Sequence, residues 1–588
     1  MSQRRLLVTT ALPYANGHAH LGHLVGYIQA DIWVRAQRLL GNTVHFVCAD
    51  DAHGTPIMLA AEKAGLSPEA FIRPIQASHE RDFADFGIAY DGYHTTHSQE
   101  NRQLAESIYA ALDARGHIAR RTIEQLYDPV KAMFLPDRYI KGECPRCGTP
   151  DQYGDNCEQC GATYAPTELK NPRSVMSGAT PELRESEHFF FRLGDFAGLL
   201  DTWLADDVAV PGVKAKLREW IDAGLRDWDI SRDAPYFGFA IPGAPGKFFY
   251  VWLDAPIGYL ASFRRLCDGP DAARHGLSPA SFDEFLRPGS ASFDARTEMH
   301  HFIGKDIVNF HGLFWPAMLH GAGYRVPTAL HVNGYLTVNG AKMSKSRGTF
   351  IQARTYLDAG LHPEYLRYYF AAKSGGGVDD LDLNFADFTA RVNADLVGKF
   401  VNIASRCAKL LDTHFGNRLA ARPENGAGVP AWRARAAAVL AEAHARLAAE
   451  VPGAYAGRDF ARAVVATMRV ADLANEYIAE TAPWAIAKDA ARKAELHTVL
   501  TTGIHLFALL ARALKPILPA TVARIEAYLG LPSDGFADLD FDAAIDPLGE
   551  RTLQAYEPLL TRVDPQRIEA MIEASKSSLD GSAPAPAA

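Results

Sequence analysis

Three histidines cluster near the start of the chain, in the stretch ALPYANGHAHLGHLVG at residues 11–26. Turn-forming residues precede them, and apolar residues with helical spacing follow from residue 20 onward. A helix that begins there presents free backbone N–H groups and a partial positive charge, which together favour an anion. His20 and His23 share one face of this helix, so both can donate hydrogen bonds to phosphate oxygens.

Gly22 falls inside the first turn of that helix, where glycine costs about 1 kcal/mol relative to alanine. Close approach of a ligand to the backbone is one reason for a glycine at this position. Two other interpretations stay open on these residues alone. His18, His20 and His23 can form a zinc site, or they are surface histidines near a turn with no special role.

A second group of charged residues lies much later in the chain, in GAKMSKSRG at residues 340–348. Lys342, Lys345 and Arg347 alternate with serine hydroxyls, and glycines flank the group on both sides. The glycines predict a mobile loop, and mobile cations suit a triphosphate whose charge moves during a reaction. Taken alone, however, a short basic loop is usually just solvated.

The elements that must position the histidines form a βαβ unit. Residues 5–12 read as a buried strand, residues 20–41 as a helix and residues 43–51 as a second strand. Such a unit predicts a parallel sheet, whose ligands bind at the carboxyl ends of the strands. The histidine turn and the acidic pair that ends in Asp51 both fall at that edge.

Four cysteines in the pattern C-x2-C-x9-C-x2-C lie in a region, about 115–230, that looks like an insertion. Two pairs of thiolates at this spacing can converge tetrahedrally on zinc. Such a site has no open coordination position, so we expect it to be structural rather than catalytic. The predicted zinc ligands are Cys144, Cys147, Cys157 and Cys160.

The rest of the chain changes character at about residue 385. Segments typical of β-structure occur at 247–256, 299–306 and 329–340. From about 385 the sequence is helical and rich in Ala, Leu and Arg, which predicts a separate helix bundle. The final stretch SSLDGSAPAPAA predicts a disordered tail.

Composition narrows the class of protein. The chain has 588 residues and 48% hydrophobic residues, as expected for several globular domains. Its net charge of −9 argues against non-specific adhesion to DNA but not against a local basic patch for a shaped nucleic acid. No apolar run reaches the roughly 20 residues of a membrane helix, and no secretory signal is found, so we expect a cytoplasmic protein without a membrane partner.

Taken together, the two charged motifs resemble those of a known family. HLGH at 20–23 looks like the HIGH signature, and KMSKS at 342–346 matches the second signature of class I aminoacyl-tRNA synthetases. Longer strings are similar to the methionyl-tRNA synthetase family, over a resemblance that runs from about residue 5 to 545. These strings are CADDAHGTPI, DISRDAPYFG, FYVWLDAPIGY, HFIGKDI and VNGYLTVNGAKMSKSRGTF.

The resemblance implies an α/β fold with a Rossmann-like parallel sheet that is split by a zinc-binding insertion and followed by an all-α helix-bundle domain. The implied domains are the first half of the Rossmann catalytic domain at 1–115, the insertion at 116–232, the second Rossmann half at 233–325, a stem-contact region bearing KMSKS at 326–385, a helical anticodon-binding domain at 386–545, and a C-terminal extension with a disordered tail at 546–588.

The implied activity is the ATP-dependent ligation of L-methionine to tRNA(Met) through methionyl-adenylate, with release of pyrophosphate and AMP. Mg²⁺ would enter with ATP. The resemblance assigns His20, His23, Lys342 and Lys345 to the phosphates as catalytic residues, and it adds Gly22 and Ser344 to the ATP site. His18 lies outside the signature and receives no role.

The resemblance also implies two further sites. Asp51 would hold the ammonium group of methionine, and an aromatic slot would hold its thioether. A Tyr259 hydroxyl that reaches the sulfur would add selectivity. The methionine residues are Leu12, Tyr14, Asp51, Trp252, Ala255, Pro256, Tyr259, Ile307 and His311, and the anticodon residues are Asn402, Arg406 and Trp484. Gly398, one turn before Asn402, lacks a side chain, so part of the anticodon reading can shift elsewhere.

We expect the substrates to be ATP, L-methionine and tRNA(Met), including the initiator tRNA. Some relatives extend into a dimerisation domain, whereas this chain ends in a short tail, so we expect a monomer. Three alternatives stay open. They are a nucleotidyltransferase with a similar histidine turn, a non-catalytic tRNA-binding paralogue, and a class I synthetase for leucine, isoleucine, valine or cysteine.

Overall fold

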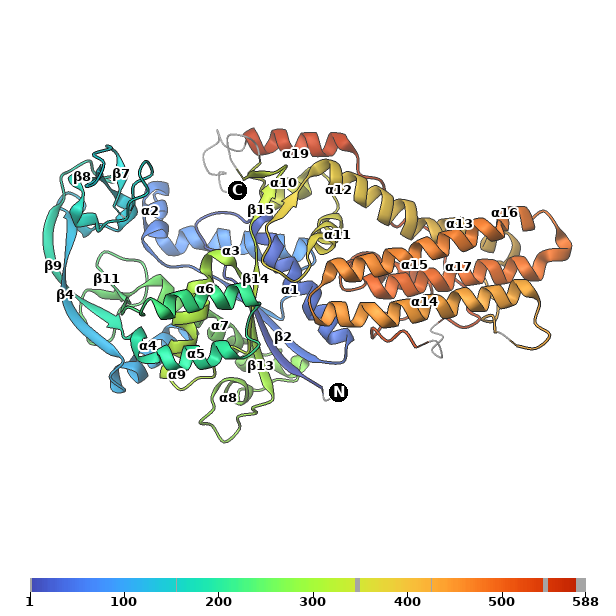
Figure 1. Ribbon diagram of the computed structural model, residues 1–588, viewed down its shortest axis with the longest axis horizontal. Coiled ribbons are helices and arrows are strands. Elements are labelled where there is room, and N and C mark those ends of the chain that lie inside the picture. The colour runs from blue at the N-terminus through green and yellow to red at the C-terminus, as the bar shows by residue number, and fades with distance from the viewer. Residues whose placement is uncertain (1–2, 155, 344–348, 425, 543–547, 578–588) are drawn as a thin grey trace.

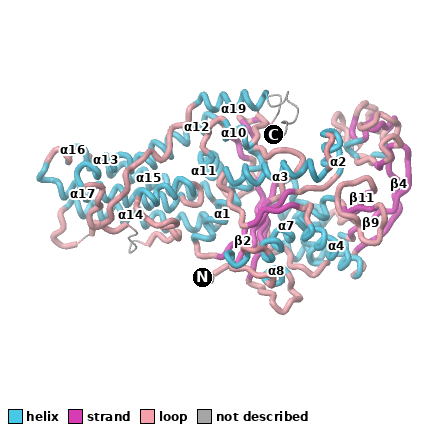
Figure 2. The backbone as a smooth tube through the Cα atoms, turned by 180° about the vertical axis from the view of Figure 1, so that it is seen from behind, coloured by secondary structure: helices cyan, strands magenta, loops and turns pink. Residues whose placement is uncertain are grey.

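The computed structural model describes residues 3–154, 156–343, 349–424, 426–542 and 548–577. Its centre is a five-stranded parallel sheet with the order β14-β13-β1-β2-β3. Figure 2 shows this sheet in the middle of the molecule. The strands are β1 (Arg5–Thr10), β2 (Thr43–Asp50), β3 (Gly92–Thr95), β13 (Thr297–Gly304) and β14 (Ala329–Asn333).

Strand β1 is the central strand, and its sequence RLLVTT is buried at every position after Arg5. A strand that is covered on both faces reads as a continuous apolar run, which explains why the sequence revealed it. From β1 the chain adds β2 and β3 on one side and later adds β13 and β14 on the other. The strand order therefore reverses at β1, and the carboxyl ends of β1 and β13 form the place where such folds bind ligands.

Helices cover both faces of the sheet, and the helix predicted at 20–41 is confirmed as α1. The strand prediction for 247–256 is wrong after Phe249, because α7 begins at Val251. From that point the apolar residues recur with helical rather than alternating spacing. The helices of this half are α1 (Leu21–Leu39), α2 (Thr55–Ala64), α3 (Pro68–Asp85), α4 (Gln99–Ala114), α7 (Val251–Asp268), α8 (Ser281–Leu286) and α9 (Trp315–Gly321).

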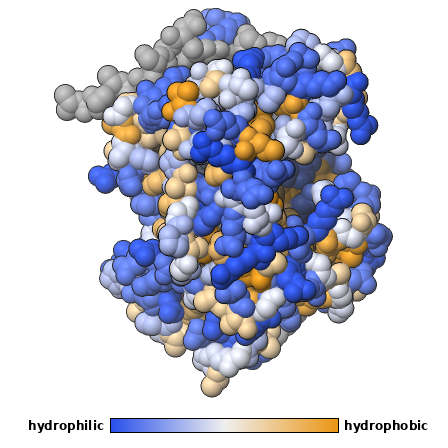
Figure 3. Space-filling model, turned by 90° about the vertical axis from the view of Figure 1, so that its left-hand side faces the viewer, coloured by the Kyte–Doolittle hydropathy of each residue, from blue (hydrophilic) through white to orange (hydrophobic). Residues whose placement is uncertain are grey.

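The insertion projects from one end of the molecule on a long antiparallel arm, at the left in Figure 1. The arm is made by β4 (Ile118–Asp128) and β9 (Glu182–Phe191), and it carries a small sheet with the order β7-β6-β8. Figure 3 looks onto this end, where the surface is mostly hydrophilic with scattered apolar side chains. The remaining elements are β5 (Met133–Phe134), β6 (Ile140–Glu143), β7 (Gln152–Tyr153), β8 (Lys170–Ser174), α5 (Ala197–Ala205), α6 (Pro211–Asp222), β10 (Trp228–Asp229), β11 (Ser231–Asp233) and β12 (Lys247–Phe249).

A small sheet and two helices lead from the half built on the parallel sheet into the helical half. The sheet has the order β16-β15-β17, and its strand β16 carries Lys342. The elements are β15 (Leu336–Val338), β16 (Ala341–Lys342), α10 (Ala353–Asp358), α11 (Pro363–Lys373) and β17 (Leu381–Leu383).

The helical half is an elongated bundle at the opposite end from the insertion (Figure 1). Its first helix contains a π-helical stretch, Val392–Phe400, between α12 and α13. The predicted α/β fold with a separate all-α domain is thus confirmed. The bundle helices are α12 (Phe385–Arg391), α13 (Val401–Phe415), α14 (Ala431–Ala456), α15 (Phe460–Thr481), α16 (Pro483–Ile486), α17 (Lys493–Leu514) and α18 (Pro519–Tyr528).

Helix α17 is the apolar centre of this bundle. Within the described part of the chain, Ala490–Leu514 is the one helical segment long and apolar enough to cross a membrane, and 83% of its most apolar window is buried inside the protein. Burial of this kind is what a core helix of a bundle shows.

Several contacts tie the halves together, and two of them show how. The fully buried guanidinium of Arg367 on α11 donates to Asp31 on α1 at 2.7 Å and to the carbonyl oxygen of Ile517, beyond α17, at 2.8 Å. The last described helix, α19 (Pro565–Ser577), packs back against α10. The region beyond 546 therefore contains an ordered helix, and the predicted disordered tail lies outside the described residues after Ser577.

Candidate active site

The histidine turn sits between β1 and α1, and His20 is the N-terminal cap of that helix. Its Nδ1 accepts a hydrogen bond from the backbone N–H of Gly22 at 3.1 Å. The backbone N–H of His20 in turn donates to Nδ1 of His23 at 3.3 Å, and the two rings stack with centroids 3.6 Å apart. The sequence thus closes a capping box with two imidazoles, which holds both rings at the start of the helix.

Both imidazoles are neutral donors. Burial lowers the pKa of His20 to about 4, and burial together with the neighbouring His20 lowers the pKa of His23 well below its usual value. A neutral imidazole that accepts through Nδ1 carries its proton on Nε2. Each ring therefore presents an Nε2–H group, and this arrangement suits hydrogen bonds to phosphate oxygens.

His18 does not join the other two histidines, which argues against the zinc interpretation of this cluster. Its Nδ1 lies 2.9 Å from Ser78 Oγ on α3. Among the residues that the structure describes, the group of side chains placed to hold a metal is the cysteine cluster and not these histidines.

The second signature lies against the first. A Cβ atom on Gly22 would come within 2.6 Å of the Met343 methyl group and 2.9 Å of His20 Cε1. A side chain at this position would press on the Met343 methyl group and on the His20 ring, so glycine lets the two signatures pack closely. The approach of a ligand to this glycine stays a prediction. Lys342 is exposed on β16, whereas Ser344 and Lys345 lie outside the described residues.

The backbone joins the two segments as well. The N–H of Leu21 donates to the carbonyl oxygen of Ile351 at 2.9 Å, and the N–H of Ala353 donates to the carbonyl oxygen of Ala19 at 2.8 Å. His20 and Gln352 form an isolated bridge between these bonds. The chain that follows the second signature is thus paired directly with the histidine turn.

The acidic residue predicted for the ammonium group lies at the same edge of the sheet. Asp51 follows β2 and is paired through its backbone with Tyr14, which follows β1. Its Oδ1 is buried and has no hydrogen-bond partner among the described residues. Burial, with a smaller contribution from the charge of Asp254, raises the pKa of Asp51 well above its usual value. A buried, unpartnered carboxylate oxygen is an attractive site for a cation.

Most residues predicted for the aromatic slot lie on α7 and in the short helical segments after β13. The ring of Trp252 stacks on Phe310 with centroids 3.8 Å apart. Leu12 packs against the same helix, because a Cβ on Gly258 would lie 2.9 Å from its Cδ1. Ala255 and Pro256 are buried on α7 as well.

Tyr259 and His311 form a hydrogen-bonded pair. His311 Nδ1 lies 3.0 Å from the carbonyl oxygen of Ile307 and must carry the proton there, since that oxygen can only accept. Burial lowers the pKa of His311 to about 4, so its Nε2 is an acceptor. Tyr259 therefore donates its hydroxyl proton to His311 Nε2 over 2.8 Å. The sulfur of a bound ligand would therefore compete with His311 for the single hydroxyl proton of Tyr259.

Sequence analysis missed a second buried acid beside this pocket. Asp254 is fully buried, is hydrogen-bonded through Oδ2 to His53 Nδ1, and has no described partner for Oδ1. His53 in turn lies 3.0 Å from His97 through Nε2 and Nδ1. An acid within the apolar run FYVWLDAP and a histidine within CADDAHG were the available signals.

The four cysteines converge as the spacing predicted. Their sulfur atoms all lie within 4.8 Å of one another, with Cys144 3.8 Å from Cys160 and Cys147 3.6 Å from Cys157. Four thiolates bound at about 2.3 Å around a tetrahedral zinc ion lie about 3.8 Å apart, so the arrangement fits such an ion. Backbone N–H groups of the second cysteine of each pair point to the sulfur of the first, at 3.5 and 3.4 Å.

The three residues predicted for the anticodon gather on one face of the bundle. The guanidinium of Arg406 lies 5.4 Å from the centroid of the Trp484 ring, which is 46% exposed. Asn402 contacts Asn475 at 3.4 Å. A hollow of about 410 Å³ adjoins Asn402 and is lined by Val397, Gly398, Val401, Asn402, Ser405, Tyr556, Pro558, Leu560 and Arg562.

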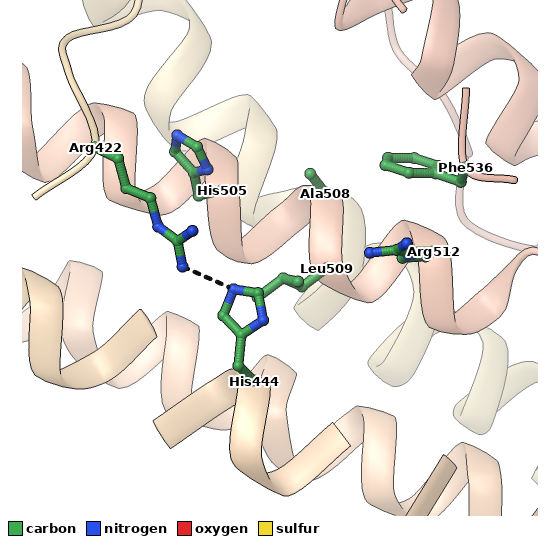
Figure 4. A pocket seen from close by; sticks show the side chains of 7 residues that line it. All are labelled: Arg422, His444, His505, Ala508, Leu509, Arg512 and Phe536. Atoms are coloured by element: carbon green, nitrogen blue, oxygen red, sulfur yellow. Dashed lines mark hydrogen bonds between the residues drawn. The ribbon is translucent and has the colours of Figure 1, made fainter. Parts of the chain in front are cut away.

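Another cavity lies inside the bundle, away from all these residues (Figure 4). It measures about 10 Å³, enough for about one water molecule. His444 there receives a hydrogen bond from Arg422 at 3.1 Å. The cavity is too small for a substrate, and we assign it no function.

Comparisons with known proteins agree with this geometry. Residues 6–408 match a family model described as class I tRNA synthetases (M), and residues 427–573 match the anticodon binding domain of methionyl tRNA ligase. The methionine–tRNA ligase of Xanthomonas axonopodis pv. citri (strain 306) is 63% identical over 98% of this chain and 79% of its own length. That of Xanthomonas campestris pv. campestris (strain B100) is 62% identical over 100% of this chain and 80% of its own length.

A solved structure supports the fold. The methionyl-tRNA synthetase of Mycobacterium tuberculosis, bound by methionyl-adenylate, superposes with a TM-score of 0.74 at 23% identity, covering 95% of this chain and 100% of that one. With family models over most of its length and relatives above 60% identity, this chain belongs to the methionine–tRNA ligase family of class I aminoacyl-tRNA synthetases.

Proposed function

We propose that this methionine–tRNA ligase activates L-methionine with Mg-ATP in the crevice at the carboxyl ends of β1, β2 and β13, and then charges tRNA(Met), including the initiator tRNA. The observation that carries the proposal is the meeting of the two signature segments at the edge of the sheet where Asp51 holds a buried carboxylate oxygen without a described partner. This crevice thereby offers hydrogen-bond donors for phosphates at one end and an anion for an ammonium group at the other.

In the proposed first step an oxygen of the methionine carboxylate attacks the α-phosphorus of ATP. The new P–O bond gives methionyl-adenylate, and the bond to the β-phosphate breaks to release pyrophosphate. No covalent enzyme intermediate is needed, so the protein acts by position and by electrostatic stabilisation. We assign the Nε2–H groups of His20 and His23, with Lys342 and Lys345, to the phosphates; Gly22 and Ser344 complete the ATP site.

The amino acid is held at the other end of the crevice. Asp51 pairs with the ammonium group, which satisfies the carboxylate oxygen that lacks a described partner in the empty site. Trp252, Tyr259 and His311 enclose the thioether, because sulfur makes favourable contacts with aromatic rings. The remaining wall is assigned to Leu12, Tyr14, Ala255, Pro256 and Ile307.

In the proposed second step the terminal 2′-hydroxyl of the tRNA attacks the activated carbonyl and releases AMP. The helical half would choose the tRNA by its anticodon, since RNA sequence is usually read from unstacked loop bases. The exposed Trp484 ring with Arg406 beside it offers a stacking surface, and Asn402 offers an amide for base edges. The hollow that Gly398 helps to line offers space for a base beside Asn402.

The zinc ion that the four cysteines fit would be structural. Four thiolates leave no open coordination position, so the ion would order the insertion and take no part in the reaction. Cys144, Cys147, Cys157 and Cys160 are all needed to complete the tetrahedron. The cytoplasmic location, the monomeric state and the domain limits stay predictions, and sedimentation at several protein concentrations tests the second of them.

ATP–pyrophosphate exchange with single amino acids tests the function directly. We expect exchange with methionine and none with leucine, isoleucine, valine or cysteine. Exchange with leucine, isoleucine, valine or cysteine in place of methionine would show that the enzyme activates a different amino acid. No exchange with any of them, together with tight tRNA binding, would make it a non-catalytic tRNA-binding protein.

A further inference from the structure

Helix α3 contacts the histidine turn. His79 on this helix is fully buried. Its Nε2 lies 2.8 Å from the carbonyl oxygen of Gly17 and its Nδ1 lies 3.1 Å from Asp50 Oδ1. The carbonyl oxygen can only accept, so His79 donates its Nε2 proton to the backbone of the turn that carries the signature histidines.

A second bond from α3 holds the next residue of the turn. The hydroxyl of Ser78 donates to the carbonyl oxygen of Ile75 at 2.9 Å. Its oxygen is thus left to accept from Nδ1 of His18 at 2.9 Å. His18, which has no place in the phosphate site, therefore anchors the turn to α3.

The same helix also holds the segment that follows the second signature. Arg354, in the first turn of α10, donates through Nε to Asp82 Oδ1 at 3.0 Å, and its Nη2 donates to the same oxygen and to Asp85 at 2.6 Å. The Asp82 side chain is 1% exposed. Arg81 also reaches Asp82, but it is 58% exposed, so Arg354 is the better-buried cationic partner of this carboxylate.

These contacts close a triangle. One side is the pairing of residues 351–353 with Ala19 and Leu21 in the histidine turn. The second side joins the turn to α3, and the third joins Arg354 to α3 through Asp82. A backbone pairing of only two hydrogen bonds permits sliding and rotation, whereas attachment of both partners to one rigid helix fixes their separation.

We infer that α3 is the common anchor of the two signature segments and that Asp82 and Arg354 are positioning residues for adenylate formation. The inference rests on the proposed function. Neither side chain touches a substrate; each acts by setting the distance between the imidazoles of His20 and His23 and the chain that carries the second signature. Misplacement of reacting groups by about 1 Å lowers a rate by about 100-fold, so a loosened anchor has a kinetic effect.

The test is ATP–pyrophosphate exchange with the full chain carrying Arg354→Ala. We expect kcat to fall by about 10–100-fold because the phosphate donors lose their alignment. The KM for methionine should stay within about twofold, because among the described residues no hydrogen bond or ion pair joins α10 to Asp51 or to the residues of the predicted slot. Arg354→Lys should recover most of the rate, since a lysine ammonium can still donate to Asp82.

Arg102→Ala is the matched control, because it removes an exposed ion pair with Glu106 on α4 that touches neither signature. We expect it to leave exchange unchanged. Asp82→Asn is the second variant, and it keeps an acceptor for Arg354 while removing the charge. It should lower kcat less than Arg354→Ala, and the double variant should lower kcat no further than Arg354→Ala alone.

An unchanged kcat in Arg354→Ala would overturn the inference while wild-type exchange with methionine leaves the proposed function intact. A loss of activity that tracks a lower melting temperature, and that neither Arg354→Lys recovers nor Asp82→Asn reproduces, would also overturn it, because the pair would then only stabilise the fold. Failure of the wild type to exchange with methionine would instead refute the proposed function.

Discussion

In the catalytic half the candidate functional side chains are largely buried and hydrogen-bonded, whereas in the helical half they are more exposed and touch one another loosely. His20 and His23 close a capping box, and His311 is held between a carbonyl oxygen and a phenol. On the bundle, Arg406 lies 5.4 Å from the ring of Trp484, whose exposure is 46%.

This difference follows from the size of what each half binds. A small substrate supplies few contacts, so the donors and acceptors of its site must be fixed and shielded from water before it binds. An RNA loop brings its own aromatic bases and phosphates, so the side chains that bind it can stay exposed to solvent until the RNA binds. Variants of the two halves should therefore separate in two assays: the exchange reaction, which needs no tRNA, and tRNA charging, which does.

The largest effect is expected for Lys345→Ala, although Lys345 lies outside the described residues. Removal of one preorganised donor to a transition-state charge costs about 10²–10³ in rate. Adenylate formation should slow by at least about this factor, while methionine binding in equilibrium dialysis barely changes. Pyrophosphate exchange near the wild-type rate would remove Lys345 from the phosphate site.

Asp51→Asn should come next, and it should act on binding. A hydrogen bond to a charged group contributes about 1.5–3 kcal/mol, so the KM for methionine in exchange should rise by about 10–100-fold. Asp254→Asn is the informative comparison, because it removes another buried acid that also has an oxygen without a described partner, while the proposed ammonium partner stays. An equal rise of KM in both variants would mean that Asp51 is not the specific partner.

The same carboxylate gives a pH prediction. Burial raises the pKa of Asp51 well above its usual value, so acidification protonates it earlier than an exposed aspartate. The ammonium group pairs with the ionised form, and the KM for methionine should therefore rise as the pH falls through that raised pKa. Exchange kinetics between about pH 8 and pH 5.5 measure this, with Asp51→Asn as the variant in which the dependence should disappear.

Trp484→Ala should show the reverse pattern. Stacking of a base on an aromatic side chain is worth about 1–3 kcal/mol, so kcat/KM for tRNA in the charging assay should fall by about 5–150-fold. The exchange reaction should be unaffected, because Trp484 lies at the far end of the bundle from the crevice (Figure 1). Trp484→Phe, which keeps an aromatic face, should give a kcat/KM for tRNA between those of the wild type and Trp484→Ala. Equal damage to exchange and charging would abolish the separation of the halves.

Local patterns in the sequence predicted the parts of the fold that local physics determines. The βαβ unit, the helix start near His20 and the cysteine knuckles depend on residues close together in the chain, where periodicity and spacing carry the information. The strand expected at 247–256 was half wrong because a short apolar run does not distinguish a strand from a buried helix.

The contacts that no local pattern revealed join residues far apart in the chain. His53 meets Asp254 across 201 positions, and Arg354 meets Asp82 across 272. Gly22 is a further case, since the sequence suggested a ligand beside it and gave no sign that the methyl group of Met343, 321 positions later, packs there. The residues to which we assign the chemistry stand in recognisable local motifs, whereas the side chains that hold them in place needed three-dimensional information.

Tyr259→Phe should give the smallest effect and the finest test of how the catalytic half reads its substrate. The hydroxyl already donates to His311 Nε2, and sulfur is a weak acceptor that has to compete for the same proton. One such neutral hydrogen bond is worth about 0.5–1.5 kcal/mol, so the ratio of kcat/KM for methionine to that for norleucine should fall by only about 2–10-fold. An unchanged ratio would mean that the hydroxyl serves His311 alone and that the shape of the slot selects the thioether.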